Sequence, residues 1–191
     1  MDPVLEQVRD FADSAHGGQL RKYSPDRYIV HPVRVMECCA AHGATRAQQA
    51  AALLHDVLED TRVTEEDLLR FLRTVMEEAE ALHTLTLVVE LTDVYTTSAY
   101  PKWKRRRRKE EEAERMRHIS AEAQTIKYAD ILDNTLDITQ NDPGFAFKFL
   151  RECRQLLRVM TAGDAELRAE AQALIARCID SLPHSGRHER G

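Results

Sequence analysis

Residues 50–60 read Ala50-Ala51-Ala52-Leu53-Leu54-His55-Asp56-Val57-Leu58-Glu59-Asp60. This run is apolar enough for a buried helix, yet it carries four polar side chains that a buried helix normally excludes. Positions four apart share one face of a helix, so Glu59 should lie over His55, and Asp60 over Asp56, both pairs facing the interior. Buried carboxylates need a compensating positive charge, which a divalent cation supplies. The run therefore predicts a metal site on a helix of about residues 46–58.

Length and composition favour a single helical domain. The chain has 191 residues, of which 43% are hydrophobic, so it can bury a sizeable core. Only 7 Gly and 6 Pro occur among many Ala, Leu, Glu and Arg residues, which favours helix over sheet. We expect one all-α domain over residues 1–182, followed by a flexible polar tail at 183–191.

The sequence also indicates the cellular compartment and limits the classes of binding partner. No run approaches the roughly 18 apolar residues of a membrane span, and no secretory signal follows the initial Met. The four cysteines lack C-x-x-C spacing, which predicts reduced thiols and a cytoplasmic protein.

A net charge of −5 argues against general polyanion binding, although residues 102–109 contain seven basic residues in eight. Arg106, Arg107 and Arg108 each precede a Glu by four residues, so we expect a solvated helix there.

Apolar spacing predicts further helices along the chain. The first spans residues 3–16 and ends at Gly17-Gly18, another follows His31-Pro32, and Thr64 with Asp67 resembles a capping box that starts the next. Residues 92–101 should form a surface loop. The remaining helices are expected at about residues 120–139, 145–160 and 166–182. In the first of these three, the core face is predicted to hold Ile126, Ala129, Leu132 and Leu136, with Asp133 and Asp137 facing solvent.

Two further residues complete a candidate ligand set. His31 stands before a Pro-initiated helix, where a histidine taken alone is more often a structural cap than a ligand. Asp130 interrupts an apolar helical pattern without serving as a cap. Together with His55 and Asp56 they would give two imidazoles and two carboxylates. This mixed set suits Mn²⁺, Fe²⁺ or Zn²⁺ with positions left open for water.

The order His-Pro, then His-Asp-x-x-Glu-Asp-Thr, then Ala-Asp with Asn four residues later resembles the HD-domain phosphohydrolases. The resemblance spans roughly residues 8–136. It is to the hydrolase domain of RelA/SpoT-type enzymes and to the small alarmone hydrolases related to the metazoan SpoT homologue. Other matching pieces are Ala15-His16-Gly17-Gly18-Gln19, Arg21-Lys22 and Tyr28-Ile29-Val30.

The resemblance implies an HD-domain helical fold that binds one Mn²⁺, with Zn²⁺ or Fe²⁺ possible, and a hydrolase that removes the 3′-diphosphate of guanosine tetra- or pentaphosphate. It assigns metal binding to His31, His55, Asp56 and Asp130. It also assigns catalysis to Glu59 and Asp60, and substrate binding to Arg21, Lys22, Lys102 and Asn134. The expected partner is a small nucleotide rather than a membrane or a nucleic acid.

The sequence departs from the family pattern at two positions. Ile131 stands where the family commonly has a basic residue, and Asp133 where it commonly has His or Tyr. Two alternatives therefore stay open: an HD phosphatase for another nucleotide, such as a nucleoside monophosphate or the 2′-phosphate of NADPH, and a non-catalytic HD module that binds nucleic acid through residues 102–109.

Overall fold

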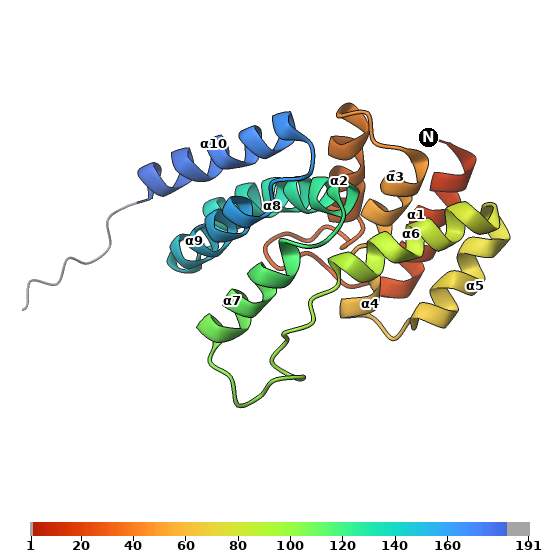
Figure 1. Ribbon diagram of the computed structural model, residues 1–191, viewed down its shortest axis with the longest axis horizontal. Helices are drawn as coiled ribbons and strands as arrows, with labels where there is room; N and C mark the ends of the chain where they lie inside the picture. The colour runs from red at the N-terminus through yellow and green to blue at the C-terminus, as the bar shows by residue number, and fades with distance from the viewer. Residues whose placement is uncertain (1, 183–191) are drawn as a thin grey trace, which may run out of the picture.

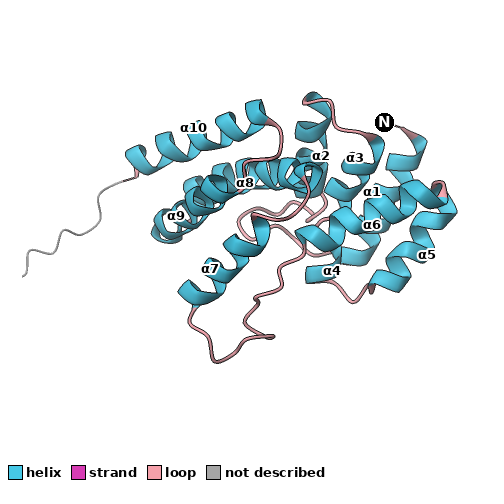
Figure 2. Ribbon diagram, in the orientation of Figure 1, coloured by secondary structure: helices cyan, strands magenta, loops and turns pink. Residues whose placement is uncertain are grey.

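The computed structural model describes residues 2–182 and is all-α over that range, in agreement with the predicted fold class (Figures 1 and 2). The predicted tail at 183–191 lies outside the described residues. The helices are α1 (Pro3–His16), α2 (Val30–Ala41), α3 (Arg46–Leu54), α4 (Val57–Asp60), α5 (Glu65–Val75), α6 (Glu78–Leu91), α7 (Arg105–Met116), α8 (Ala121–Asn141), α9 (Pro143–Val159) and α10 (Ala165–Ser181).

The helix ends follow their local sequence. The Asp2 side chain accepts a hydrogen bond from Val4 N at 2.8 Å, and Gly17 ends α1 in the left-handed conformation at φ 55°. At α5, Thr64 and Asp67 form the predicted capping box. These boundaries agree with the prediction because each depends on side chains within a few residues of the helix end.

The helix predicted over residues 46–58 is wrong in one respect: it is interrupted. Regular α3 ends at Leu54, His55 and Asp56 form a turn, and α4 starts at Val57. Glu59 and Asp60, predicted to face the interior, are exposed as whole residues although their carboxylates are partly covered, whereas His55 is buried. The apolar pattern continues through the break, so the sequence gives no local sign of it.

Helix α8 runs through the middle of the fold (Figure 1). It contacts α2, α3, α6, α9 and α10. Its buried Tyr128 donates a hydrogen bond to Met160 O at 2.9 Å, at the end of α9. Ile126 and Ala129 are buried as predicted, but Leu136 is 58% exposed, so the predicted core face ends one turn too late. Buried side chains from α1 through α10 belong to one hydrophobic cluster.

The loop predicted at residues 92–101 extends to Lys104 and leads into α7. The buried Glu112 carboxylate accepts hydrogen bonds from the amides of Val94 and Tyr95 at 3.1 and 3.0 Å, which ties the loop to this helix. Of the three expected pairs, Arg106 and Arg107 lie 3.8 Å from Glu110 and Glu111. The third pair is absent among the described residues because Glu112 is turned inward.

The sequence predicts reduced thiols and no membrane-spanning helix. Cys38, Cys39, Cys153 and Cys178 are free thiols. Among residues 2–182, none of the helices combines the length and apolar character needed to cross a bilayer.

Candidate metal centre and active site

Four side chains of metal-ligand type meet where α2, the α3–α4 turn and α8 come together. His31 lies in the first turn of α2, and its Nε2 is 3.2 Å from Asp130 Oδ1 and 3.7 Å from Asp56 Oδ2. His55 Nε2 is 3.0 Å from Asp56 Oδ2 and 3.7 Å from Asp130 Oδ1. One ligand atom from each of His31, His55 and Asp56 fits within a 4.8 Å span. The tertiary fold thus brings together the four predicted ligands.

His55 and Asp56 lie at the interruption between α3 and α4. Both residues keep right-handed helical backbone angles, and Asp60 N donates to Asp56 O at 2.9 Å. Successive side chains on a helix leave the axis about 100° apart, yet the His55 and Asp56 side chains meet, with His55 Nε2 3.0 Å from Asp56 Oδ2.

Each imidazole is oriented by a hydrogen bond on its far side. His31 Nδ1 lies 2.7 Å from Asp133 Oδ2, and His55 Nδ1 lies 2.8 Å from Ala52 O. A neutral imidazole that donates from Nδ1 keeps its lone pair on Nε2. Both Nε2 atoms are thereby directed toward the two carboxylates.

The carboxylates have outer partners as well. The Tyr28 hydroxyl donates to Asp56 Oδ2 at 2.5 Å. Lys127 Nζ lies 2.9 Å from Asp130 Oδ2, and Asn134 Nδ2 donates to Asp130 Oδ1 at 2.6 Å. Outer partners of this kind fix the orientation of metal ligands.

The cluster is charged in a way that requires a cation or protons at its centre. Burial lowers the pKa of His55, but Asp56 and Asp130 outweigh burial and raise it to about 10. Burial raises the pKa of Asp56, but the two imidazoles hold it well below its usual range. Lys127 compensates one of the two carboxylate charges, and the other needs either a proton on an imidazole or a bound cation.

One atom tests whether a metal ion fits. His55 Nε2 is buried and makes no hydrogen bond within the described residues, although a buried nitrogen normally has a partner. Its lone pair faces two carboxylate oxygens and the second imidazole. Two nitrogen and two oxygen donors suit a divalent ion of the Mn²⁺, Fe²⁺ or Zn²⁺ kind, so the residues fit such an ion.

The predicted catalytic pair lies just beyond the centre, on α4. Glu59 Oε2 accepts a hydrogen bond from Asp93 N at 3.3 Å. Partial burial of its carboxylate and the nearby charge of Asp93 raise the pKa of Glu59 to about 7. Burial and the charge of Asp56 also raise the pKa of Asp60. Glu59 can therefore exchange a proton near neutral pH, as an acid–base group must.

The predicted substrate-binding residues are distributed over different surroundings. Asn134 lies beside Asp130, as described above. Arg21 is only 9% exposed and lies 2.7 Å from Asp137, with Asp133 at 3.7 Å. Lys22 is 70% exposed and lies 3.4 Å from Asp142, whereas Lys102 is exposed in the segment before α7. The structure brings Asn134 to the centre but not Lys22 or Lys102.

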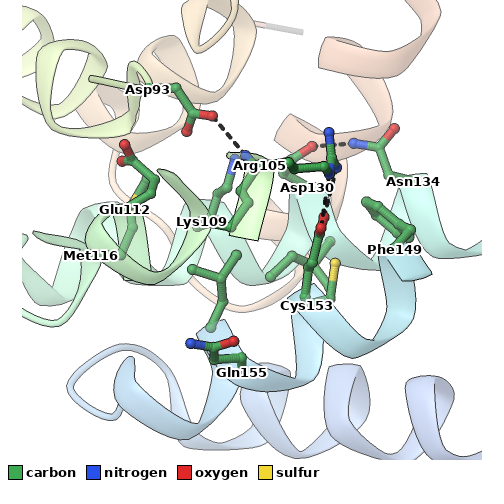
Figure 3. Close-up of a pocket in the computed structure, with 14 residues that line it drawn as sticks. Asp93, Arg105, Lys109, Glu112, Met116, Asp130, Asn134, Phe149, Cys153 and Gln155 are labelled. Atoms are coloured by element: carbon green, nitrogen blue, oxygen red, sulfur yellow. Dashed lines mark hydrogen bonds and ion pairs between the residues drawn. The ribbon is translucent and has the colours of Figure 1, made fainter. Parts of the chain in front are cut away.

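A cavity of about 140 Å³ adjoins Asp130 between α7, α8 and α9 (Figure 3). Arg105, Lys109 and Lys127 line it. Arg105 pairs with Glu152 at 2.7 Å, and Lys109 pairs with Asp93 at 3.0 Å. Figure 3 shows Lys109 beside Asp93. Its apolar wall includes Met116, Ile131, Phe149, Cys153 and Leu156. An elongated anion bound at the centre could extend along these cations.

Several of these residues escaped prediction. Lys127 precedes Asp130 by three positions, a spacing that places both on one helix face and could have indicated the ion pair. Asp133 and Asp137 were predicted to face solvent, which is wrong: their side chains are 13% and 20% exposed and contact His31 and Arg21. Nothing in the sequence near Asp133 indicates a partner from α2.

Comparison with known proteins identifies relatives. An HD domain family model matches residues 9–161. A guanosine-3′,5′-bis(diphosphate) 3′-pyrophosphohydrolase of Vibrio cholerae is 38% identical over 144 residues, 73% of this chain and 18% of that protein. The enzyme of that name called MESH1 in Xenopus tropicalis is 34% identical over 145 residues, 73% of this chain and 72% of the relative.

A solved structure, described as a metazoan orthologue of SpoT that hydrolyses ppGpp and plays a role in starvation responses, has the same fold. It superposes with a TM-score of 0.78 at 22% identity, covering 96% of this chain and 98% of the other. The chain spans less than a fifth of its long Vibrio relative but most of the Xenopus one. The chain therefore belongs to the HD domain family and, within it, to the group that contains the MESH1 protein of Xenopus tropicalis.

Proposed function

We propose that this chain is a metal-dependent phosphohydrolase that removes the 3′-diphosphate of guanosine tetra- or pentaphosphate and yields GDP or GTP with pyrophosphate. The observation that carries the proposal is the convergence of His31, His55, Asp56 and Asp130 beside a cavity lined with cations. The Vibrio and Xenopus relatives, both named as guanosine-3′,5′-bis(diphosphate) 3′-pyrophosphohydrolases, support this substrate.

The four convergent side chains would hold the metal ion, for which we propose Mn²⁺. When bound, such an ion lowers the pKa of a water molecule and neutralises charge on a phosphoryl oxygen. Each candidate ligand has an outer partner that orients it. Asp133 contacts His31, Ala52 contacts His55, Tyr28 contacts Asp56, and both Lys127 and Asn134 contact Asp130. The free thiols are consistent with a reducing, cytoplasmic setting.

In the proposed reaction, water adds to the phosphorus bonded to the 3′ oxygen. The bond between that phosphorus and the 3′ oxygen breaks, pyrophosphate leaves, and a proton returns to the 3′ oxygen. We assign proton transfer to Glu59 and Asp60, because both have a raised pKa beside the centre.

Positioning of the phosphates requires cations in fixed places. Arg105, Lys109 and Lys127 line the cavity and are held there by Glu152, Asp93 and Asp130. We retain Asn134, Arg21, Lys22 and Lys102 as proposed substrate contacts. Asn134 has the strongest structural support because it both lines the cavity and hydrogen-bonds to Asp130.

One observation favours a second candidate, an HD phosphatase for another nucleotide. Ile131 lines the cavity and presents an apolar wall where the resemblance described above leads us to expect a basic residue. A wall of this kind binds a chain of phosphates less well than a basic residue does. The two candidates share the metal centre, so the released product distinguishes them.

The experiment uses purified protein loaded with Mn²⁺ and offered guanosine tetraphosphate, nucleoside monophosphates and NADPH. We expect pyrophosphate from the first and no orthophosphate from the others. Asp56→Ala should lose both bound metal and turnover, by about 10³-fold or more. Asp10→Ala, which removes an exposed carboxylate paired with Arg9, is the control and should keep both. Orthophosphate release from another nucleotide, or activity retained in Asp56→Ala, would contradict the proposal.

A further inference from the structure

The side chain of Asp133 lies behind the metal centre, on the face of α8 that meets α2. Its Oδ2 is 2.7 Å from His31 Nδ1, a distance typical of a charge-assisted hydrogen bond, and the side chain is only 13% exposed. His31 itself is 1% exposed, so its ring has little freedom to turn. Asp133 is therefore a built-in partner of this ring rather than a passing surface contact.

The two imidazoles of the centre are backed by different groups. His55 Nδ1 faces the neutral carbonyl of Ala52, whereas His31 Nδ1 faces a carboxylate. A carboxylate behind a ligand imidazole fixes the tautomer and makes the opposite nitrogen a stronger donor to a metal. The His31 Nε2 lone pair is thus directed toward Asp130 Oδ1 and Asp56 Oδ2, at 3.2 and 3.7 Å.

Asp133 is held from behind by two cations. Arg21 approaches its Oδ2 at 3.7 Å and Arg34 its Oδ1 at 3.8 Å. Arg21 is buried to 9% exposure, and its closer partner is Asp137 at 2.7 Å. These contacts place the Asp133 carboxylate between a buried guanidinium and the ring of His31.

We propose that Asp133 is a positioning residue for the metal centre: it holds His31 in the tautomer and orientation that bind the ion, and Arg21 fixes Asp133 in turn. This inference rests on the metal-dependent function proposed above. It also gives Arg21 a place behind the centre, in addition to the substrate contact that the resemblance assigns to it. The alternative is that Asp133 serves only as a counter-ion for Arg21.

The test measures Mn²⁺ affinity of the metal-free full-length protein by calorimetric titration, with circular dichroism as a check on folding. We expect Asp133→Ala to bind Mn²⁺ about 10- to 100-fold more weakly than the wild type. Asp133→Asn keeps the shape of the side chain but loses its charge. The Mn²⁺ affinity of this variant should therefore lie between those of Asp133→Ala and the wild type. At saturating Mn²⁺, the KM for the nucleotide should stay near the wild-type value in Asp133→Asn.

Two control variants separate positioning from ion pairing. Asp137→Asn removes the closer partner of Arg21 without touching His31, and Glu122→Gln removes the carboxylate of an exposed pair with His83 at 2.8 Å. Both should bind Mn²⁺ within about twofold of the wild type. A loss in Asp137→Asn as large as that in Asp133→Ala would overturn the proposal in favour of ion pairing.

The remaining outcomes are also decisive. If Asp133→Ala does not fold, the near-isosteric Asp133→Asn decides, and an affinity equal to that of the wild type would overturn the inference. If the wild type binds Mn²⁺ but both Asp133 variants bind it equally well, the inference fails while the proposed function stands. If the wild type itself binds no divalent ion, both fail together.

Discussion

At the scale of single residues, the geometry of the candidate metal centre depends on side chains that contact the candidate ligands from outside. Tyr28, Lys127 and Asp133 contact Asp56, Asp130 and His31 respectively. None of the three was predicted to contact a ligand, because a tyrosine, a lysine and an aspartate have many uses on a protein surface. The candidate ligands could be predicted because polar residues in an apolar pattern need an explanation, whereas their partners stand in patterns that need none.

The raised pKa of Glu59 leads to a prediction about pH. A general base must be ionised, and Glu59 has a pKa of about 7, so protonation removes the base as the pH falls. We expect kcat/KM to decline below about pH 7, or lower where a bound cation draws the pKa down. Glu59→Gln should reduce kcat/KM by about 10²- to 10⁴-fold and flatten this acid limb. The measurement is a rate profile from pH 5 to 9 at saturating Mn²⁺.

Metal-bound water can titrate in the same range, so the variant rather than the wild-type profile is informative. Glu66→Gln serves as the control, because Glu66 is exposed and pairs with Arg70 on α5. It should leave both rate and profile unchanged. An unaltered acid limb in Glu59→Gln would exclude Glu59 as the base.

At the scale of elements, the short turn between α3 and α4 matters most. Periodicity predicted a continuous helix because the residues on both sides keep an apolar face. The structure instead stops the regular helix at Leu54 and places His55 and Asp56 in a turn. Such a break has no local signature of Gly or Pro. The helix that it ends, α3, packs against its neighbour α2 and against the distant α8.

A second element-scale feature is the close approach of the α9–α10 turn to α8. A Cβ on Gly163 would lie 2.7 Å from Tyr128 Cε2 and 2.8 Å from the backbone nitrogen of Thr125. Because a backbone atom cannot move aside, we expect Gly163→Ala to lower the free energy of unfolding by about 2 kcal/mol. In a protein of this size that corresponds to a fall in Tm of about 4–8 °C, measured by calorimetry.

Gly144→Ala provides the matched comparison. Its added Cβ would meet nothing nearer than an Asp142 side-chain atom at 3.8 Å, an ordinary contact, and the position lies in the first turn of α9. This variant should be neutral or slightly stabilising. Equal Tm values for the two variants would show that the approach at Gly163 is not tight.

At the scale of the whole molecule, the candidate ligands join segments that are distant in sequence. His31 comes from α2, His55 and Asp56 from the α3–α4 turn, and Asp130 from α8. An ion that binds all four binds only the folded chain, so its affinity adds to stability. The same contacts leave two carboxylates close together when the ion is removed, which requires protons in its place.

Metal removal should therefore lower the Tm of the wild type. At an Mn²⁺ concentration 100 times its Kd, binding contributes about 2.7 kcal/mol, equivalent to about 5–10 °C here. Calorimetry before and after chelation measures the shift. In Asp56→Ala the chelator should have little effect, and a comparable shift in that variant would place the stabilising ion elsewhere.

The sequence by itself determined the fold class, the main helices, and four candidate ligands with an acidic pair after them. The helices, His55, Asp56 and Asp130 follow from helical periodicity, from local capping groups, and from polar residues in apolar surroundings, all of which act over a few residues. The roles of His31 and of the acidic pair rest on the resemblance to the HD-domain phosphohydrolases. Only the tertiary structure decided how the ligands converge, where α3 breaks, and that Asp133 and Lys127 stand behind the centre. The reason is physical: such contacts depend on the packing of α2 and α8 against the α3–α4 turn, and no local pattern encodes the relative placement of distant helices.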